Sequence, residues 1–140
     1  MKRRLAAILA ADVVGFSAMV QHDELSAIQT VKGHFAAFEA PISLHHGRIV
    51  KTMGDGFLAE FPSVVEAVSC ASALLKLVQQ RNENLPVSNQ TVFRMGLHAG
   101  DILQDGDDIL GDGVNIAARL ESIATPGCLA ISAKVRTPEQ

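Results

Sequence analysis

Two short stretches of this sequence hold carboxylates that local structure alone does not require. Asp12 interrupts the apolar run LAAILAADVV, where a charge is costly to bury unless it is paired or bound to a metal. Asp55 lies between two glycines in KTMGDGF, although a tight turn needs neither this carboxylate nor Lys51. Taken alone, each aspartate is also typical of a turn or a solvated group. If the two meet, they form an oxygen-rich site suited to Mg²⁺ or Mn²⁺, and two such ions can catalyse phosphoryl transfer.

The segment around Asp12 is predicted to be a buried strand over residues 5–14. Its basic start and apolar stretch also resemble a secretory signal peptide. The apolar stretch is at the short limit of roughly 7 residues for such a peptide, however, and the pattern resumes at Val13. Beyond it, apolar residues recur every three or four positions from Leu25 to Ile42, which predicts an amphipathic helix that Pro41 breaks or restarts.

The segment around Asp55 is predicted to be a β-hairpin with this aspartate at its tip, because glycine tolerates the backbone of close turns. Its strands are expected over residues 48–53 and 57–61. The elements expected after the hairpin are a helix from Ser63 to about Asn82, a strand over 93–103, an acidic loop over 104–108, a helix over 111–121 and a strand over 129–132. This order favours a split βαβ, ferredoxin-like α/β sandwich with an antiparallel-rich sheet and helices packed on it, rather than a doubly wound sheet.

Composition narrows the classes of protein that remain. The 140 residues predict one domain, and 48% hydrophobic residues predict a packed core. A net charge of -3 argues against nucleic-acid binding, which needs clustered Lys and Arg. No apolar run approaches the roughly 20 residues of a membrane span. Cys70 and Cys128 lack metal or redox spacing and are interpreted as core thiols of a reducing compartment, so a cytoplasmic location is expected.

Three segments together carry a family resemblance. ADVVGFS at 11–17, KTMGDGF at 51–57 and GDDILGDGVNIAARLE at 106–121 resemble the signature segments of class III nucleotidyl cyclases, the adenylate and guanylate cyclase catalytic domain. The resemblance implies a ferredoxin-like core related to the polymerase palm. It also implies a head-to-tail dimer with active sites at the interface. Because all the segments lie on one chain, a homodimer with two equivalent sites is expected.

The resemblance implies a role for each matching residue. Two Mg²⁺ or Mn²⁺ ions are held by Asp12, Asp55 and the backbone carbonyl of Val13. The residues expected to bind ATP are Lys51 and Asp108 at the base, Asn115 and Arg119 at the ribose and the reacting phosphorus, and Gly15, Phe16 and Ser17 at the triphosphate. Lys51 and Asp108 match the edge of adenine, whereas guanylate-specific members carry Glu and Cys there. A solvated lysine, a loop acid, a solvated helix arginine and a simple turn are the alternatives for Lys51, Asp108, Arg119 and Gly15 to Ser17.

The expected function is therefore adenylate cyclisation of ATP in signal transduction. Compared with the family, the domain over 1–140 is expected to be truncated before its final strand pair, so the lysine that contacts the triphosphate has no counterpart here. A non-catalytic dimerisation or nucleotide-sensing module with the same fold is the main alternative, and guanylate cyclase is another. Diguanylate cyclase is disfavoured because its GG[DE]EF hairpin is absent.

Overall fold

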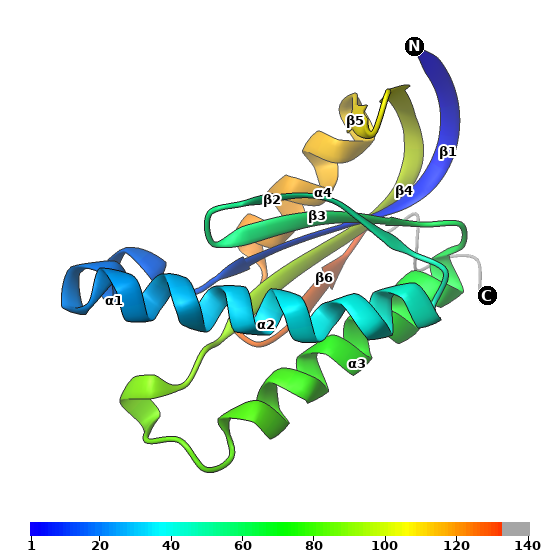
Figure 1. Cartoon of the computed structure of the whole chain (residues 1–140). Coiled ribbons are helices and arrows are strands. Elements are labelled where there is room, and N and C mark those ends of the chain that lie inside the picture. Colours follow the sequence, from blue (N-terminus) through cyan, green and yellow to red (C-terminus); the bar gives the residue numbers. More distant parts are fainter. Residues whose placement is uncertain (133–140) are drawn as a thin grey trace.

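The sheet that organises the fold has the strand order β2-β3-β1-β4-β5, with β6 paired to β4. The computed structural model describes residues 1–132 (Figure 1). The elements in chain order are β1 (Lys2–Val13), α1 (Phe16–His22), α2 (Glu24–Leu44), β2 (Arg48–Met53), β3 (Gly56–Phe61), α3 (Val64–Asn82), the 3₁₀ turn η1 (Val87–Asn89), β4 (Phe93–Asp105), β5 (Asp108–Leu110), α4 (Asp112–Ile123) and β6 (Leu129–Ile131). All strand pairs are antiparallel except β4 with β6. This arrangement confirms the predicted antiparallel-rich split βαβ sandwich.

Helices cover both faces of the sheet. Side chains alternate between the two faces along each strand, so β1 contributes apolar side chains to both. The odd-numbered residues of β1 from Ala7 to Val13 pack with Phe35 and Phe38 of α2 and with Leu74 of α3. The even-numbered residues Ala6, Ile8 and Ala10 pack under α4 with Ala117. Figure 1 shows α2 and α3 together on one side of the sheet and α4 on the other. The segment that resembles a signal peptide is therefore the central strand of the domain.

Glycine fixes the contact between α4 and the sheet. A Cβ at Gly96 of β4 would collide with the backbone of Ala117 and Glu121 on α4. The helix can approach this closely only because Gly96 has no side chain. The third resemblance segment is thus held directly against the two central strands.

Three expectations about the elements are corrected by the structure. α2 continues through Pro41 to Leu44, with Phe38 and Ile42 on either side of Pro41 buried in the core, although Pro41 has no N–H to donate within the helix. The acidic loop after β4 is a hairpin, in which Asp105 ends β4 and Asp108 begins β5. Cys70 is buried as expected, but Cys128 is exposed. It lies in the turn between α4 and β6, where its N–H donates to the Thr125 carbonyl.

The remaining expected elements are confirmed. β1, the β2–β3 hairpin, α3, α4 and β6 all form within a few residues of the predicted bounds. The Ser63 side chain accepts from the Glu66 N–H and caps α3, while the Glu66 carboxylate bonds His46. Within residues 1–132, no helix is both long and apolar enough to cross a membrane.

Candidate active site

Asp12 and Asp55 meet at one end of the central strands. Asp12 pairs in register with Gly56 of β3 and with Arg94 of β4. The N–H of the next residue, Val13, donates to the Asp55 carbonyl at 3.0 Å. A side chain at Gly56 would press on the Ala11 carbonyl, so the close approach of the hairpin to β1 depends on glycine. Residues that are 43 positions apart in sequence are therefore neighbours.

Negative charge is poorly compensated at this end. Asp12 Oδ1 is buried and has no hydrogen-bond partner within the described residues, and its nearest cation is Arg94 Nε at 3.6 Å. Burial, together with the charge of Asp12, raises the pKa of Asp55 above its ordinary value. An unpartnered carboxylate oxygen on Asp12 beside the Asp55 carboxyl fits a divalent cation. No group of three His, Cys, Asp or Glu side chains in residues 1–132 forms a metal site, so ligand oxygens from elsewhere would have to complete the coordination.

Two residues near Asp12 were missed by the sequence analysis. Glu121 of α4 faces the sheet, and burial together with the neighbouring Asp12 raises its pKa to about 7. Its Oε2 lies 3.9 Å from Arg94 Nε, which also approaches Asp12. Arg94 additionally donates to the Ser122 carbonyl at 3.3 Å. Glu121 ends the segment GDDILGDGVNIAARLE, but its side-chain direction becomes clear only when Ala117, one turn earlier, is known to be buried.

The residues after Asp12 lie where the first strand turns into a helix. The Val13 side chain is buried, so only its backbone is available at the site. Gly15 adopts φ 73° and precedes α1, which begins at Phe16. Phe16 is half-buried and Ser17 is exposed. The structure thus shows a strand-to-helix turn here, and the predicted contact with phosphate stays a prediction.

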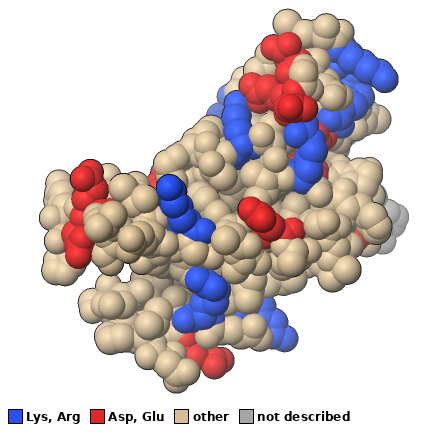
Figure 2. All heavy atoms as spheres, viewed as in Figure 1, with Lys and Arg blue, Asp and Glu red and all other residues tan. Residues whose placement is uncertain are grey.

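Lys51 and Asp108, the two predicted base-reading residues, are in direct contact. Lys51 Nζ lies 3.0 Å from Asp108 Oδ1 and 3.3 Å from Oδ2. The hydrogen bond from Lys51, followed by that from the Ile109 N–H, holds the pKa of Asp108 below its ordinary value. Both side chains are about 40% exposed, so they remain accessible to a ligand. Figure 2 shows acidic and basic side chains side by side at the upper end of the molecule, where Figure 1 places β5.

A bulge in β2 determines which way Lys51 points. The register of β2 against β3 shifts between Ile49 and Lys51, so that Arg48 pairs with Glu60 and Lys51 with Leu58. Residues three apart on a regular strand point to opposite faces, but the extra residue turns Lys51 to the face of Leu58. Leu58 packs in the cluster under α4, on the same face as Asp12. The bulge therefore brings Lys51 onto the face of the sheet that carries the carboxylates.

Asn115 and Arg119 lie apart from the other predicted residues. They are four positions apart on α4 and both are exposed. Ala117 between them is fully buried against the sheet, so the helical period directs Asn115 and Arg119 away from it. The structure thus brings together Asp12 with Asp55, and Lys51 with Asp108. Within residues 1–132, no hydrogen bond or ion pair joins Arg119 to Asp12.

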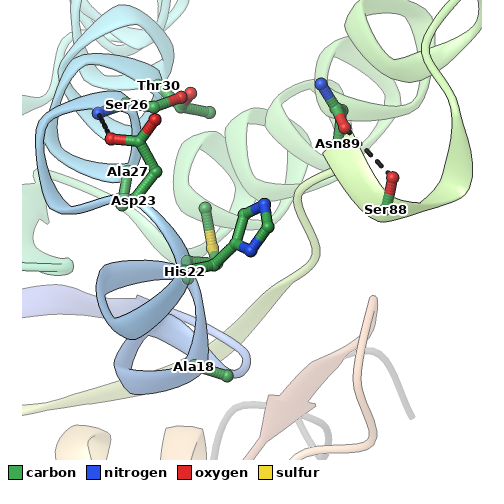
Figure 3. A pocket seen from close by; sticks show the side chains of 9 residues that line it. Ala18, His22, Asp23, Ser26, Ala27, Thr30, Ser88 and Asn89 are labelled. Atoms are coloured by element: carbon green, nitrogen blue, oxygen red, sulfur yellow. Dashed lines mark hydrogen bonds between the residues drawn. The ribbon is translucent and has the colours of Figure 1, made fainter.

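One groove lies away from all these residues. A hollow of about 470 Å³ is bordered by α1, α2 and the turn η1 (Figure 3). His22, Asp23 and Thr30 line one side of it, and Ser88 and Asn89 line the other. Asp23 accepts from the Ser26 N–H and caps α2, which accounts for its position. None of the predicted site residues borders this groove.

Comparison with known proteins decides the family. Residues 2–138 match the family described as "Adenylate and Guanylate cyclase catalytic domain". This chain belongs to that family. A Rhizobium meliloti protein named "Putative adenylate cyclase 3" is 46% identical to this cyclase domain over 132 residues, which are 94% of the chain and 22% of the relative. A Streptomyces coelicolor protein named "Adenylate cyclase" is 31% identical over 87% of the chain and 30% of its own length. This cyclase domain thus spans less than a third of either relative.

Solved structures agree with this assignment. The adenylate/guanylate cyclase/hydrolase from Silicibacter pomeroyi has a TM-score of 0.89 and 40% identity, over 96% of this cyclase domain and 79% of that chain. A bacterial light-regulated adenylyl cyclase has a TM-score of 0.82 at 22% identity, which shows the shared fold. The family resemblance and the fold predicted from the three segments are confirmed.

Proposed function

We propose that this cyclase domain is an adenylate cyclase, which converts ATP to 3′,5′-cyclic AMP and pyrophosphate in cytoplasmic signal transduction. The observation that carries the proposal is the pairing of Lys51 with Asp108 on the sheet face of Asp12. Adenine presents its N6 amino donor beside the N1 acceptor, so a lysine donor and an aspartate acceptor complement it. Guanine reverses both edges. The names of the two relatives agree with this choice.

The Lys51–Asp108 pair can accept a base without separating. An ammonium group has three donors and a carboxylate has about four acceptor positions, so each group keeps free capacity while the pair persists. Lys51 would donate to adenine N1, and Asp108 would accept from the N6 amino group. Guanine would leave both groups mispaired, and a site built on such contacts can discriminate by about 10⁴-fold.

Asp12, Asp55 and the Val13 carbonyl would hold two Mg²⁺ or Mn²⁺ ions. Support comes from the unpartnered Asp12 Oδ1 and from the raised pKa of Asp55. When bound, such ions supply a lowered pKa for the ribose 3′-hydroxyl and charge neutralisation for the triphosphate. The backbone N–H groups of Gly15, Phe16 and Ser17 would bind the triphosphate at the start of α1. No covalent enzyme intermediate is needed, since the 3′-hydroxyl oxygen attacks the α-phosphorus as pyrophosphate leaves.

Asn115 and Arg119 would act on the nucleotide held by a second copy of the chain. Their exposed positions on α4 face away from Asp12 of the same chain, so a head-to-tail homodimer would bring them to the partner's metal end. Asn115 would orient the ribose, and the Arg119 guanidinium would meet charge that develops on the phosphoryl oxygens. Each dimer would contain two equivalent active sites.

Product analysis tests the proposal. The whole chain is incubated with Mn²⁺ and either ATP or GTP, and cyclic AMP, cyclic GMP and pyrophosphate are quantified. We expect metal-dependent cyclic AMP formation and much slower cyclic GMP formation. ATP binding without product would support the nucleotide-sensing alternative, and a preference for GTP would support guanylate cyclase.

A further inference from the structure

Glu60 is a buried carboxylate that the proposed function does not use. It lies in β3 with only 7% of its surface exposed. Arg4 Nη2 approaches its Oε1 at 2.7 Å, and Arg48 donates to its Oε2 at 2.8 Å. Three strands, β1, β3 and β2, are thus joined at one carboxylate. Burial of such a charge is stabilised only by close pairing of this kind.

Both arginines also reach beyond Glu60 to the β4–β5 hairpin. Arg48 Nη2 donates to the Asp107 carbonyl at 2.9 Å. Arg4 Nε donates to Gln104 Oε1 at 2.8 Å. Asp107 is the residue before Asp108, and Gln104 lies on the opposite strand of the same hairpin. The two arginines therefore hold the hairpin from both sides of its turn.

The contacts converge on the Lys51–Asp108 pair. Arg48 lies three residues before Lys51, and the bulge in β2 places both side chains on the face of Glu60 and Leu58. Arg48 is thus bonded to the carbonyl that precedes one base-reading residue and lies on the strand that carries the other. A fixed guanidinium can serve both acceptors at once, because its donors form a planar fork.

We propose that Glu60, Arg48 and Arg4 are positioning residues for base selection, and that they act by fixing the β4–β5 turn so that Asp108 faces adenine. This inference rests on the proposed function, in which Lys51 and Asp108 read the base. None of the three residues needs to touch the nucleotide. Misplacement by about 1 Å can cost roughly 10²-fold in a positioned site, so loosening the turn should erode discrimination.

Arg48→Lys tests the inference most sharply. Lysine keeps a cation for Glu60 but cannot hold Glu60 and the Asp107 carbonyl with the same planar fork. We expect the ratio of kcat/KM for ATP to that for GTP to fall about tenfold, with KM for ATP rising more than kcat falls. The dissociation constants of fluorescent ATP and GTP analogues are measured in parallel, because binding does not require turnover. Arg3→Gln is the matched control, because Arg3 is exposed and has no ion pair within residues 1–132, and it should leave the ratio unchanged.

A second comparison separates positioning from a purely structural role. In an Asp108→Ala background, Arg48→Lys should change the ATP:GTP ratio no further, because its effect passes through Asp108. An unchanged ratio in Arg48→Lys alone, with only a lower Tm, would overturn the inference. If Lys51→Glu with Asp108→Cys also leaves the ratio unchanged, the proposed base reading fails instead. If Arg48→Lys does not fold, Glu60→Gln is measured in the same way, and the same two outcomes decide.

Discussion

The two ends of the candidate site differ in how their charges are balanced. At the end of β1, Asp12 and Asp55 crowd negative charge, and Asp12 Oδ1 has no hydrogen-bond partner in the described residues. At the proposed base-reading end, Lys51 and Asp108 neutralise each other at 3.0 Å. The pKa of Asp55 is raised, whereas the pKa of Asp108 is lowered. The end at Asp12 and Asp55 is therefore suited to a cation from outside the chain. At the other end, Lys51 and Asp108 are already paired without a nucleotide.

Removing a charge at the first end should have the largest effect. Asp55→Asn keeps the turn geometry but removes a proposed metal ligand, so kcat/KM should fall about a thousandfold, together with Mn²⁺ affinity. The measurements are turnover in saturating Mn²⁺ and a direct metal titration. Glu83→Gln, at an exposed carboxylate at the end of α3, is the control. Unchanged turnover in Asp55→Asn would remove this residue from the mechanism.

Reversing the second end should redirect the substrate. Lys51→Glu with Asp108→Cys should shift the preference from ATP toward GTP, since Glu can accept the guanine N1 proton and Cys can donate weakly to O6. Each single change should mainly damage ATP use, because one mispaired polar group costs about 1 to 3 kcal/mol. The measurement is kcat/KM for both nucleotides in the wild type, both single variants and the double variant. A double variant with the wild-type ATP:GTP ratio would show that the pair does not read the base.

A smaller effect is expected on stability when the pH is varied, and it must be distinguished from the effect of pH on the two ends of the site. His34 of α2 is buried, and burial followed by the charge of Arg81 lowers its pKa to about 4. In the unfolded chain His34 gains a proton near pH 6.5, whereas in the folded chain it does so only near pH 4. The free energy of unfolding should therefore decrease as the pH falls from about 6.5 to 4. The change should be on the order of 2 kcal/mol.

His34→Gln should make this pH dependence shallower. The measurement is denaturant unfolding at several pH values, beside activity at the same values. An equally steep dependence in the variant would assign the acid sensitivity to other groups. A loss of activity at acid pH that remains in His34→Gln then does not come from this histidine.

Much of the fold could be predicted because local patterns and tertiary structure agree. The hairpin around Asp55 has its turn glycines, and α3 has its cap at Ser63 and a regular apolar stripe. α1 was missed because its seven residues are too few for a helical period to be recognised, and none of them is buried. β5 was interpreted as loop because its three residues hold only one buried side chain, Ile109.

Apart from the family resemblance, a site residue could be recognised only where it was exceptional in its own segment. Asp12 was identified because a charge interrupts an apolar strand. Glu60 interrupts the apolar run GFLAEF in the same way, so the same reasoning could have identified it. Its partners could not be identified, since Arg4 is 56 positions away and its side chain reaches Glu60 only because β1 and β3 are neighbours in the sheet. The directions of Lys51 and Glu121 likewise depend on a bulge and on the docking of α4.

Complementation between inactive chains tests most directly whether each active site is shared by two copies. Asp12→Ala and Arg119→Ala chains are each expected to be inactive. In their heterodimer, one of the two sites combines an intact Asp12 with an intact Arg119. A 1:1 mixture should therefore regain about a quarter of wild-type cyclic AMP formation once the subunits have exchanged at random. No recovery, with subunit exchange verified independently, would contradict composite sites and place Asp12 and Arg119 in action within one chain.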